Sequence, residues 1–313
     1  MPLANQSREQ FYNSCGTTYA RFAHYTSAEA ALKIIEQKRL WMRSTACMVD
    51  YQEVQHGYKI LRNSFAKEDN AKTFIAEMDK IASGAAVQAI NNFDGWWKSG
   101  ALSFNTFITS VSEHDKDEDF HGRLSMWRAF GANFPRVAIV LNIPKHSPSG
   151  EALNLKFSPV LYLTEEQSLE LIPQVTHQIT ANSEYLKGVP RDELEGWIFS
   201  MLVLGTTCNK HEGFREEREW RAVHYPQFWQ APLVESSTET ICGVPQIVYK
   251  IPLDAAKYPA LDALDFSKIF ERLIIGPSQF PMAMRDAFSL ALTKAGVTEA
   301  GKRIFNSAIP IRS

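Results

Sequence analysis

Two glutamates separated by one residue are the side chains in this sequence best placed to do chemistry. Glu217 and Glu219 precede Trp220 and an apolar run, and the pattern over 218–225 predicts a β-strand. Residues i and i+2 of a strand point to the same face of a sheet, so the two carboxylates are expected to lie side by side. Because two adjacent carboxylates in a dry cleft are not both easily ionised, at least one of them is expected to have a raised pKa.

A second candidate for the same cleft is the run of His24, Tyr25 and Thr26, far upstream. The pattern from Tyr19 to Tyr25 predicts a strand. Thr26, with Glu29 three residues later, predicts a helix that begins with a capping box. A histidine edge and a hydroxyl between a strand and a capped helix can face a cleft, so the two ends of the chain could build one site.

Each of these residues also has a structural interpretation. The two glutamates could pair with nearby arginines on an exposed edge strand, the candidates being Arg215, Arg218 and Arg221. A histidine at a strand end could instead hydrogen-bond buried backbone. Trp127 has the character of a core residue, Asp50 and Glu53 that of a turn or cap with a helix-surface pair, and the acidic run 113–119 that of a solvated loop.

Composition narrows the class of protein. The chain has 313 residues, a net charge of −2 and 45% hydrophobic residues, which is ordinary for a globular protein without a general attraction to nucleic acid or membrane. Four scattered cysteines form no C-x-x-C pair, so neither a metal site nor a disulfide framework is expected. The first fifteen residues lack an apolar signal segment and no apolar run is long enough to span a membrane, so we expect a cytoplasmic protein.

The pattern of elements predicts an α+β fold. Beyond those named above, strands are expected at 40–44, 103–112, 136–142, 157–163, 246–251 and 272–275, and helices at 190–204 and 281–295. A run of two or three helices follows the second strand. The strands are irregularly spaced and lack regular crossover helices, so we expect a single domain over 1–313 with a helical insertion at about 50–97.

Four motifs, in chain order, resemble those of a bacterial domain-of-unknown-function family often met among defence and abortive-infection genes. They are His24-Tyr25-Thr26 with Leu40-Trp41, Asp50 and Glu53; 109–113 with Ser125-Met126-Trp127; Glu217-x-Glu219-Trp220-Arg221; and 273–277. The resemblance spans roughly residues 20–296. It departs at Val49-Asp50-Tyr51, where the family usually has Asn-Asp-Pro.

This family is in turn similar to the ADP-ribosyltransferase superfamily. That resemblance implies a split antiparallel sheet around an NAD cleft, with His24, Ser110 and Glu219 on its first, middle and late strands. It implies NAD as the substrate, with Glu219 beside the oxocarbenium-like ribose and Glu217 orienting or deprotonating the acceptor. Thr26 would assist His24 in binding NAD, and an aromatic ring would stack on nicotinamide, the candidates being Tyr25, Trp41 and Trp127.

The function implied is mono-ADP-ribosyl transfer from NAD by a toxin or anti-phage defence effector. The acceptor is nucleic acid, RNA or DNA, or protein, and the analogy with related toxins favours nucleic acid. Four basic residues lie close together in the sequence near the proposed cleft: Arg39, Arg43, Lys59 and Arg62. An antitoxin or chaperone partner could dock on the segment 113–119. The alternatives are an NAD glycohydrolase that uses the same cleft, and a non-catalytic module that senses a nucleotide or a phage protein.

Overall fold

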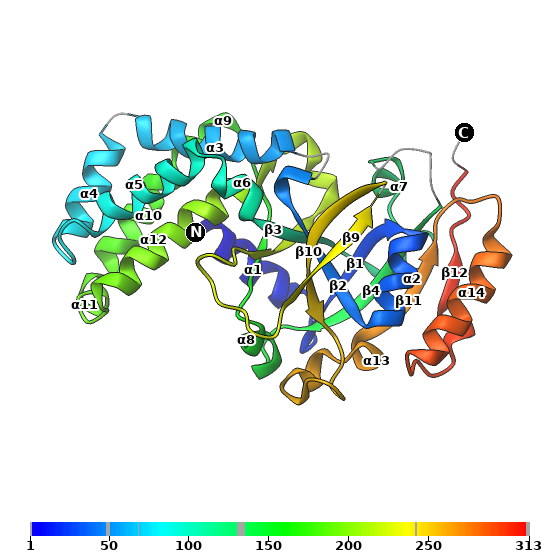
Figure 1. The fold of residues 1–313 in the computed structure, drawn as a ribbon. Coiled ribbons are helices and arrows are strands. Elements are labelled where there is room, and N and C mark those ends of the chain that lie inside the picture. The colour runs from blue at the N-terminus through cyan, green and yellow to red at the C-terminus, as the bar shows by residue number, and fades with distance from the viewer. Residues whose placement is uncertain (1, 48–50, 68, 130–134, 242, 311–313) are drawn as a thin grey trace.

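A ten-stranded open sheet forms the centre of the protein (Figure 1). The computed structural model describes residues 2–47, 51–67, 69–129, 135–241 and 243–310, and over these residues the fold is mixed α/β. The strands of this sheet are β1 (Tyr19–Ser27), β2 (Arg39–Ser44), β3 (Phe107–Glu113), β4 (Arg136–Pro144), β5 (Lys156–Pro159), β8 (Glu219–His224), β9 (Glu235–Ile241), β10 (Val244–Pro252), β11 (Phe270–Ile275) and β12 (Ile304–Asn306). Two short strands, β6 (Leu161–Leu163) and β7 (Asn209–His211), form a separate parallel pair.

The sheet divides at β3. Strand β8 pairs with β3 along 107–112, so it occupies one edge of β3 throughout. The other edge is shared, because β1 pairs with Ser112 and Glu113 and β2 pairs with Phe107 and Ile108. Residues 109–111 therefore lie between two diverging strands, and β1 continues to β4 and β11 while β2 continues to β10 and β9. All pairings in this sheet are antiparallel except that of β11 with β12.

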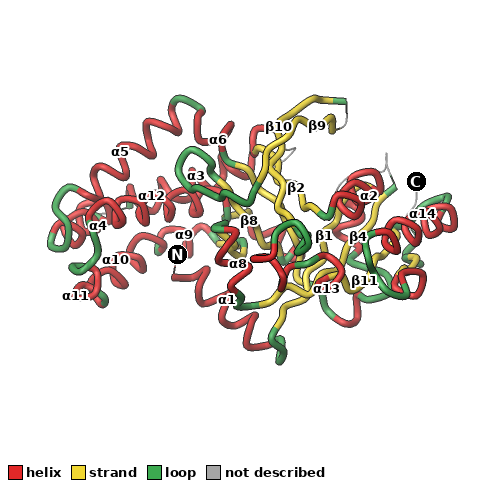
Figure 2. Tube along the Cα trace, turned by 60° about the horizontal axis from the view of Figure 1, so that its bottom comes forward, coloured by secondary structure: helices red, strands yellow, loops and turns green. Residues whose placement is uncertain are grey.

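The helices gather in two groups. One group, on the left of Figure 1, combines helices inserted between β2 and β3 with helices inserted between β6 and β7, and Figure 2 shows the same grouping. The first set is α3 (Tyr51–Ala66), α4 (Asn70–Asp79), α5 (Ala85–Lys98) and α6 (Ala101–Asn105), and the second is α9 (Glu165–Leu169), α10 (Leu171–Ala181), α11 (Ser183–Leu186) and α12 (Arg191–Thr207). Both sets share one hydrophobic core. The helical region thus comprises two segments, of which the sequence predicted only the first as an insertion.

The other helices cover the remaining parts of the sheet. They are α1 (Pro2–Ser14), α2 (Ala28–Gln37), α7 (Leu124–Ala129), α8 (Pro148–Leu153), α13 (Phe266–Ile269) and α14 (Pro281–Lys294). Helices α2 and α14 contribute to the largest core, against β4, β10 and β11. Among the described helices, none combines the length and apolar character required to cross a membrane.

Several predicted boundaries are wrong for local reasons. Ser103 and Asn105 were expected in a strand but lie in α6. This helix begins directly after Gly100, which has a left-handed φ of 76°. The expected strand 157–163 is two strands, of which β5 pairs with β8 and β6 with β7. Strand β9 was missed because its sequence is almost entirely polar.

The start of α2 also differs from the prediction. The N-cap is Ser27, whose hydroxyl accepts a hydrogen bond from the Ala30 N–H, and Thr26 lies within β1, opposite Val137. The expected capping box from Thr26 to Glu29 is therefore wrong by one residue. This places Thr26 in the last part of the β1–β4 ladder, one pair before its end.

The acidic run 113–119 is only partly the solvated loop that was expected, because residues 115–117 are exposed but His114 and Glu118 are buried. Glu118 is 8% exposed and forms a bidentate pair with Arg123, while Asp119 binds Arg21. The His114 side chain is fully buried. Glu118 and Asp119 can lie at least partly buried because each has a cationic partner, whereas Asp115 and Asp117 remain exposed.

His224, at the end of β8, makes folding sensitive to acid. It is 2% exposed, Nδ1 has no hydrogen-bond partner, and burial lowers its pKa to about 4. The His224 imidazole binds a proton near pH 6.5 in the unfolded chain but only near pH 4 in the folded chain. The folded state therefore loses stability as the pH falls from 6.5 to 4. Below pH 4 the total loss of unfolding free energy due to His224 is about 3 kcal/mol.

We therefore expect His224→Gln to flatten the dependence of unfolding free energy on pH between 6.5 and 4. Urea unfolding at closely spaced pH values measures this slope. His177→Gln, which removes an exposed histidine on α10, is the matched control and should leave the slope as in the wild type. An unchanged slope in His224→Gln would show that His224 titrates alike in both states.

Candidate active site

A hydrogen-bonded chain joins the three residues expected on the first, middle and late strands. The His24 Nδ1 lies 2.8 Å from the main-chain oxygen of Ser110, at the place where β1 and β2 diverge. The Ser110 hydroxyl in turn donates to Oε1 of Glu219. Ser110 and Glu219 share a face because Ser110 pairs with Arg221 and Ser112 with Glu219 in the β3–β8 ladder.

The tautomer of His24 follows from its partner. A carbonyl oxygen only accepts hydrogen bonds, so Nδ1 must carry the proton and Nε2 must be the acceptor. Burial lowers the pKa of His24, which favours this neutral form. Nε2 has no hydrogen bond to any described residue, so its lone pair can still bind a donor.

Glu219 is the most thoroughly bound carboxylate of the site. Its side chain is 7% exposed, and Oε1 accepts from the Ser110 hydroxyl and, at 2.7 Å, from Arg221 Nε. Oε2 accepts from Arg221 at 3.1 Å and from Lys210 Nζ at 3.3 Å. A carboxylate offers about four acceptor positions, so Glu219 has no position left over.

The charges around Glu219 keep it ionised. Burial by itself raises a carboxyl pKa, but the positive charges of Arg221 and Lys210 and their hydrogen bonds bring the pKa of Glu219 down to about 2. Glu219 lies in β8, between β3 and β5, so the expectation of an exposed edge strand is wrong. Its pairing with Arg221 is the alternative that the sequence offered.

Five residues form a buried ionic cluster, here called the carboxylate cluster: Glu53, Lys210, Glu217, Glu219 and Arg221. Lys210 Nζ contacts all three carboxylates, at 2.7 Å from Glu53, 2.5 Å from Glu217 and 3.3 Å from Glu219. Arg221 also donates to Glu53 at 2.6 Å and to the last carbonyl of α12, that of Thr207, at 2.6 Å. Three carboxylates therefore face two cations, and one negative charge is left uncompensated.

Two members of the carboxylate cluster were missed or misassigned from the sequence. Lys210 lies on β7, in a three-residue strand with no recognisable pattern, and Glu53 was expected on a helix surface. Gly57 explains how α3 brings Glu53 so close, because a Cβ at this position would lie 2.0 Å from the Thr206 oxygen of α12. Asp50, named with Glu53 in the sequence motif, lies outside the described residues.

Glu217 differs from Glu219 in its place on the chain and in the direction of its pKa shift. It ends the 3-10 helix 212–217 instead of entering β8, and Arg218 turns the chain with a left-handed φ of 43°. Burial raises the pKa of Glu217 above its ordinary value, although Lys210 opposes the shift. One of the two neighbouring carboxylates thus has a raised pKa and the other a lowered one, which is the arrangement that suits a division of roles.

Tyr25 and Trp127 occupy a packed cluster and are not open to a ligand. Their rings are 4.9 Å apart and nearly perpendicular, and they are 8% and 4% exposed. The Tyr25 hydroxyl accepts from the Arg123 N–H, and Trp127 Nε1 donates to the His121 oxygen. Stacking of nicotinamide on either ring would require this cluster to open.

The basic residues named as a nucleic-acid signal are partly neutralised. Arg39 pairs with Glu235 at 2.6 Å and Arg62 with Asp94 at 3.5 Å. In the described part of the chain, no group of three or more acidic, histidine or cysteine side chains is arranged to hold a metal ion. The centre of the carboxylate cluster instead holds the ammonium group of Lys210.

The comparison with protein families matches one segment. Residues 126–222 match the model of a family described as protein of unknown function (DUF2971). The matched segment contains Trp127 and the carboxylates of 217 and 219, whereas His24 and Ser110 lie outside it. Comparisons with curated proteins and with solved structures gave no significant match.

Proposed function

We propose that the protein cleaves NAD at the carboxylate cluster and transfers ADP-ribose to an acceptor, as a mono-ADP-ribosyltransferase. The observation that supports this proposal is the hydrogen-bonded chain from His24 through Ser110 to Glu219 at the division of the sheet. It places a neutral imidazole, a hydroxyl and an ionised carboxylate on three strands that meet at one point. The role of toxin or defence effector belongs to the same proposal.

Transfer of ADP-ribose from NAD requires a fixed negative charge beside the ribose and a separate group that accepts the proton of the acceptor. When the bond from ribose to the nicotinamide nitrogen breaks, the bonding electrons stay on that nitrogen and the ribose carbon becomes electron-poor. Glu219, held ionised, stabilises this centre by its charge and by accepting from a ribose hydroxyl. The acceptor then bonds to the ribose carbon and gives its proton to Glu217.

Lys210 gives Glu219 a means of accepting substrate. The 3.3 Å hydrogen bond from Lys210 is the longest of the four that Glu219 accepts. Lys210 also has closer partners in Glu53 and Glu217. A ribose hydroxyl can take that position if Lys210 moves fully onto these two partners. Arg221 and Ser110 would meanwhile hold the carboxylate in place, so the transition-state charge is preorganised.

The acceptor class is tested by incubating the purified chain with NAD labelled in its adenylate portion, in the presence of separate RNA, DNA and protein pools. Transfer of label to one pool, with nicotinamide released in parallel, identifies the acceptor. Nicotinamide release without labelled macromolecules would assign water as the acceptor. Neither release nor transfer in any pool would contradict the proposal.

Glu217→Gln should reduce transfer to an acceptor more than it reduces hydrolysis of NAD. Loss of a general base costs typically about 100- to 10,000-fold, and we expect at least about 100-fold for transfer but less than about tenfold for hydrolysis. Both rates are measured in one preparation. Glu216→Gln, an exposed neighbour, should leave both rates unchanged, and equal losses in Glu217→Gln would assign the two glutamates a single shared role.

A non-catalytic binding module is the second candidate. The specific observation in its favour is that all acceptor positions of Glu219 are filled by groups of the chain itself. In that case the carboxylate cluster serves to join α3, α12 and β8. A melting temperature that falls in Glu219→Gln, together with no NAD turnover by the wild type, would select this candidate.

A further inference from the structure

A cavity of about 600 Å³ lies on the face of β3 and β8 opposite to the carboxylate cluster. Its lining includes Thr109, Val111 and Ala222, which alternate with Ser110 and Arg221 along the same two strands. The inner wall is aliphatic, and its members are less than 9% exposed to solvent: Leu40, Leu141, Leu153, Ile251, Leu264 and Ile269. The cavity opens to solvent, and its volume, apolar wall and few charged groups are those of a ligand pocket.

The rim of the cavity is positively charged. Arg8 of α1, Lys145 after β4 and Lys156 of β5 line it, together with His146, and Glu151 is the carboxylate of the lining. Among the described residues, none of these three cations forms an ion pair with a carboxylate. The Lys145 ammonium donates to the main-chain oxygen of Tyr12, and that of Lys156 lies 5.6 Å from the centre of the Trp229 ring, so both have neutral partners only. The chain as a whole carries a charge of −2, so this local excess of positive charge is a property of the cavity.

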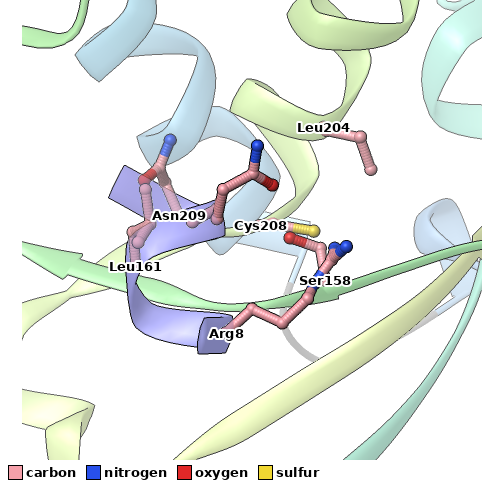
Figure 3. A pocket seen from close by; sticks show the side chains of 8 residues that line it. Arg8, Ser158, Leu161, Leu204, Cys208 and Asn209 are labelled. Atoms are coloured by element: carbon pink, nitrogen blue, oxygen red, sulfur yellow. The ribbon is translucent and has the colours of Figure 1, made fainter. Parts of the chain in front are cut away.

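Two buried polar atoms at the cavity also lack partners. Thr109 is 5% exposed and its hydroxyl makes no hydrogen bond. Arg8 donates through one terminal nitrogen to the Phe157 oxygen at 2.7 Å, but its Nε has no partner. A smaller pocket of about 60 Å³, shown in Figure 3, shares Arg8, Ser158 and Leu204 with the larger cavity and continues toward Cys208 and Asn209.

We propose that this cavity binds an amphipathic carboxylate, with its hydrocarbon chain in the aliphatic chamber and its carboxylate at Arg8, Lys145 and Lys156. A hydrocarbon chain suits a wall of leucine and isoleucine, and a carboxylate supplies the charge that the three cations lack. A nucleobase fits less well, because the buried wall offers few groups that could hydrogen-bond its edges. The proposal does not depend on the activity proposed above.

Decanoate, used below its micelle concentration, is the probe for this site, with titration calorimetry as the measurement. We expect saturable binding at one site, and binding of decanol weaker by about tenfold or more because it lacks the charge. NAD at millimolar concentration should not displace decanoate. Equal affinity for decanol and decanoate would overturn the proposal by assigning mere apolar partitioning, and displacement by NAD would overturn it by assigning a nucleotide site.

Two variant pairs locate the binding. Gly150 lies exposed on α8 at the lining, and a Cβ at this position would have only the Ser147 hydroxyl within 4 Å, at 3.6 Å. Gly150→Trp should therefore block the cavity and abolish decanoate binding, while Gly150→Ala should preserve it. Lys156→Gln should weaken binding about tenfold and Lys156→Arg should retain it. Undiminished binding in Lys156→Gln, or in a folded Gly150→Trp, would overturn the assignment.

Discussion

Arg221→Met is expected to destabilise the protein by about 3–5 kcal/mol, because it removes one partner of a buried ion pair and leaves the other uncompensated. Arg221 is 3% exposed and binds Glu219, Glu53 and the Thr207 carbonyl. Burial by itself lowers the pKa of its guanidinium, but Glu219 and Glu53 outweigh burial and keep it ionised. Without Arg221, the Thr207 carbonyl at the end of α12 loses this donor, and both carboxylates depend on Lys210 for positive charge.

Urea unfolding at pH 7 measures this loss. Arg191→Met is the matched control, since Arg191 forms an exposed pair with Glu195 and its loss should cost less than about 1 kcal/mol. The double variant Glu219→Gln with Arg221→Met should lose less than the sum of the single losses, because the two residues share one interaction. A loss below about 1 kcal/mol for Arg221→Met would mean that water enters the carboxylate cluster and replaces the pairing.

Glu219→Gln is expected to lower the rate of nicotinamide release by about 100- to 1000-fold, the usual cost of removing one preorganised transition-state interaction. The amide keeps the shape of the side chain, and Arg221 keeps Glu53, so the folded structure should persist. The variant loses the negative charge that the site holds ionised with a pKa of about 2. Single-turnover nicotinamide release gives the rate, and a urea melt of the same preparation gives the stability.

Glu113→Gln is the control for this experiment. Like Glu219, Glu113 is a carboxylate on a strand of the sheet, and it is partly buried on β3. It accepts a hydrogen bond from Trp220 Nε1 at 2.9 Å and does not belong to the carboxylate cluster. It should retain the wild-type rate of release. If Glu219→Gln and Glu113→Gln lose activity to the same extent, the effect is one of general stability and Glu219 has no special part in the chemistry.

The sequence predicted best where the signal was local. Glu217 and Glu219 do share a site, and the strands around His24 and the 219–224 segment lie close to their predicted bounds. The expected geometry of the glutamate pair was nonetheless wrong, because Arg218 adopts a left-handed turn and Glu217 precedes the strand. Turn conformations of single residues other than glycine leave little trace in a periodic pattern.

The long-range partners had no signal in the sequence. Glu53 is separated from Glu219 by helices whose apolar stripes indicate which face is buried but not what meets at their ends. Lys210 is close in sequence, but the short strand β7 and the 3-10 helix that follows it have no pattern that predicts its contact with Glu219. A charged residue is interpreted as solvated unless its partner is known, which is why the burial of Glu118 within the run 113–119 was not expected. The convergence of His24, Ser110 and Glu219 was implied by family resemblance and could not be deduced from spacing alone.

In the proposed reaction NAD binds at the carboxylate cluster, on the face of β8 that carries Glu219. The most direct test is a crystal structure of the Glu219→Gln variant with NAD, since slow cleavage should preserve the intact substrate. We expect the nicotinamide-side ribose within hydrogen-bonding distance of residue 219 and Ser110, with Lys210 withdrawn toward Glu53 and Glu217. NAD absent from this face at saturating concentration, or bound only in the cavity on the opposite face, would contradict the account.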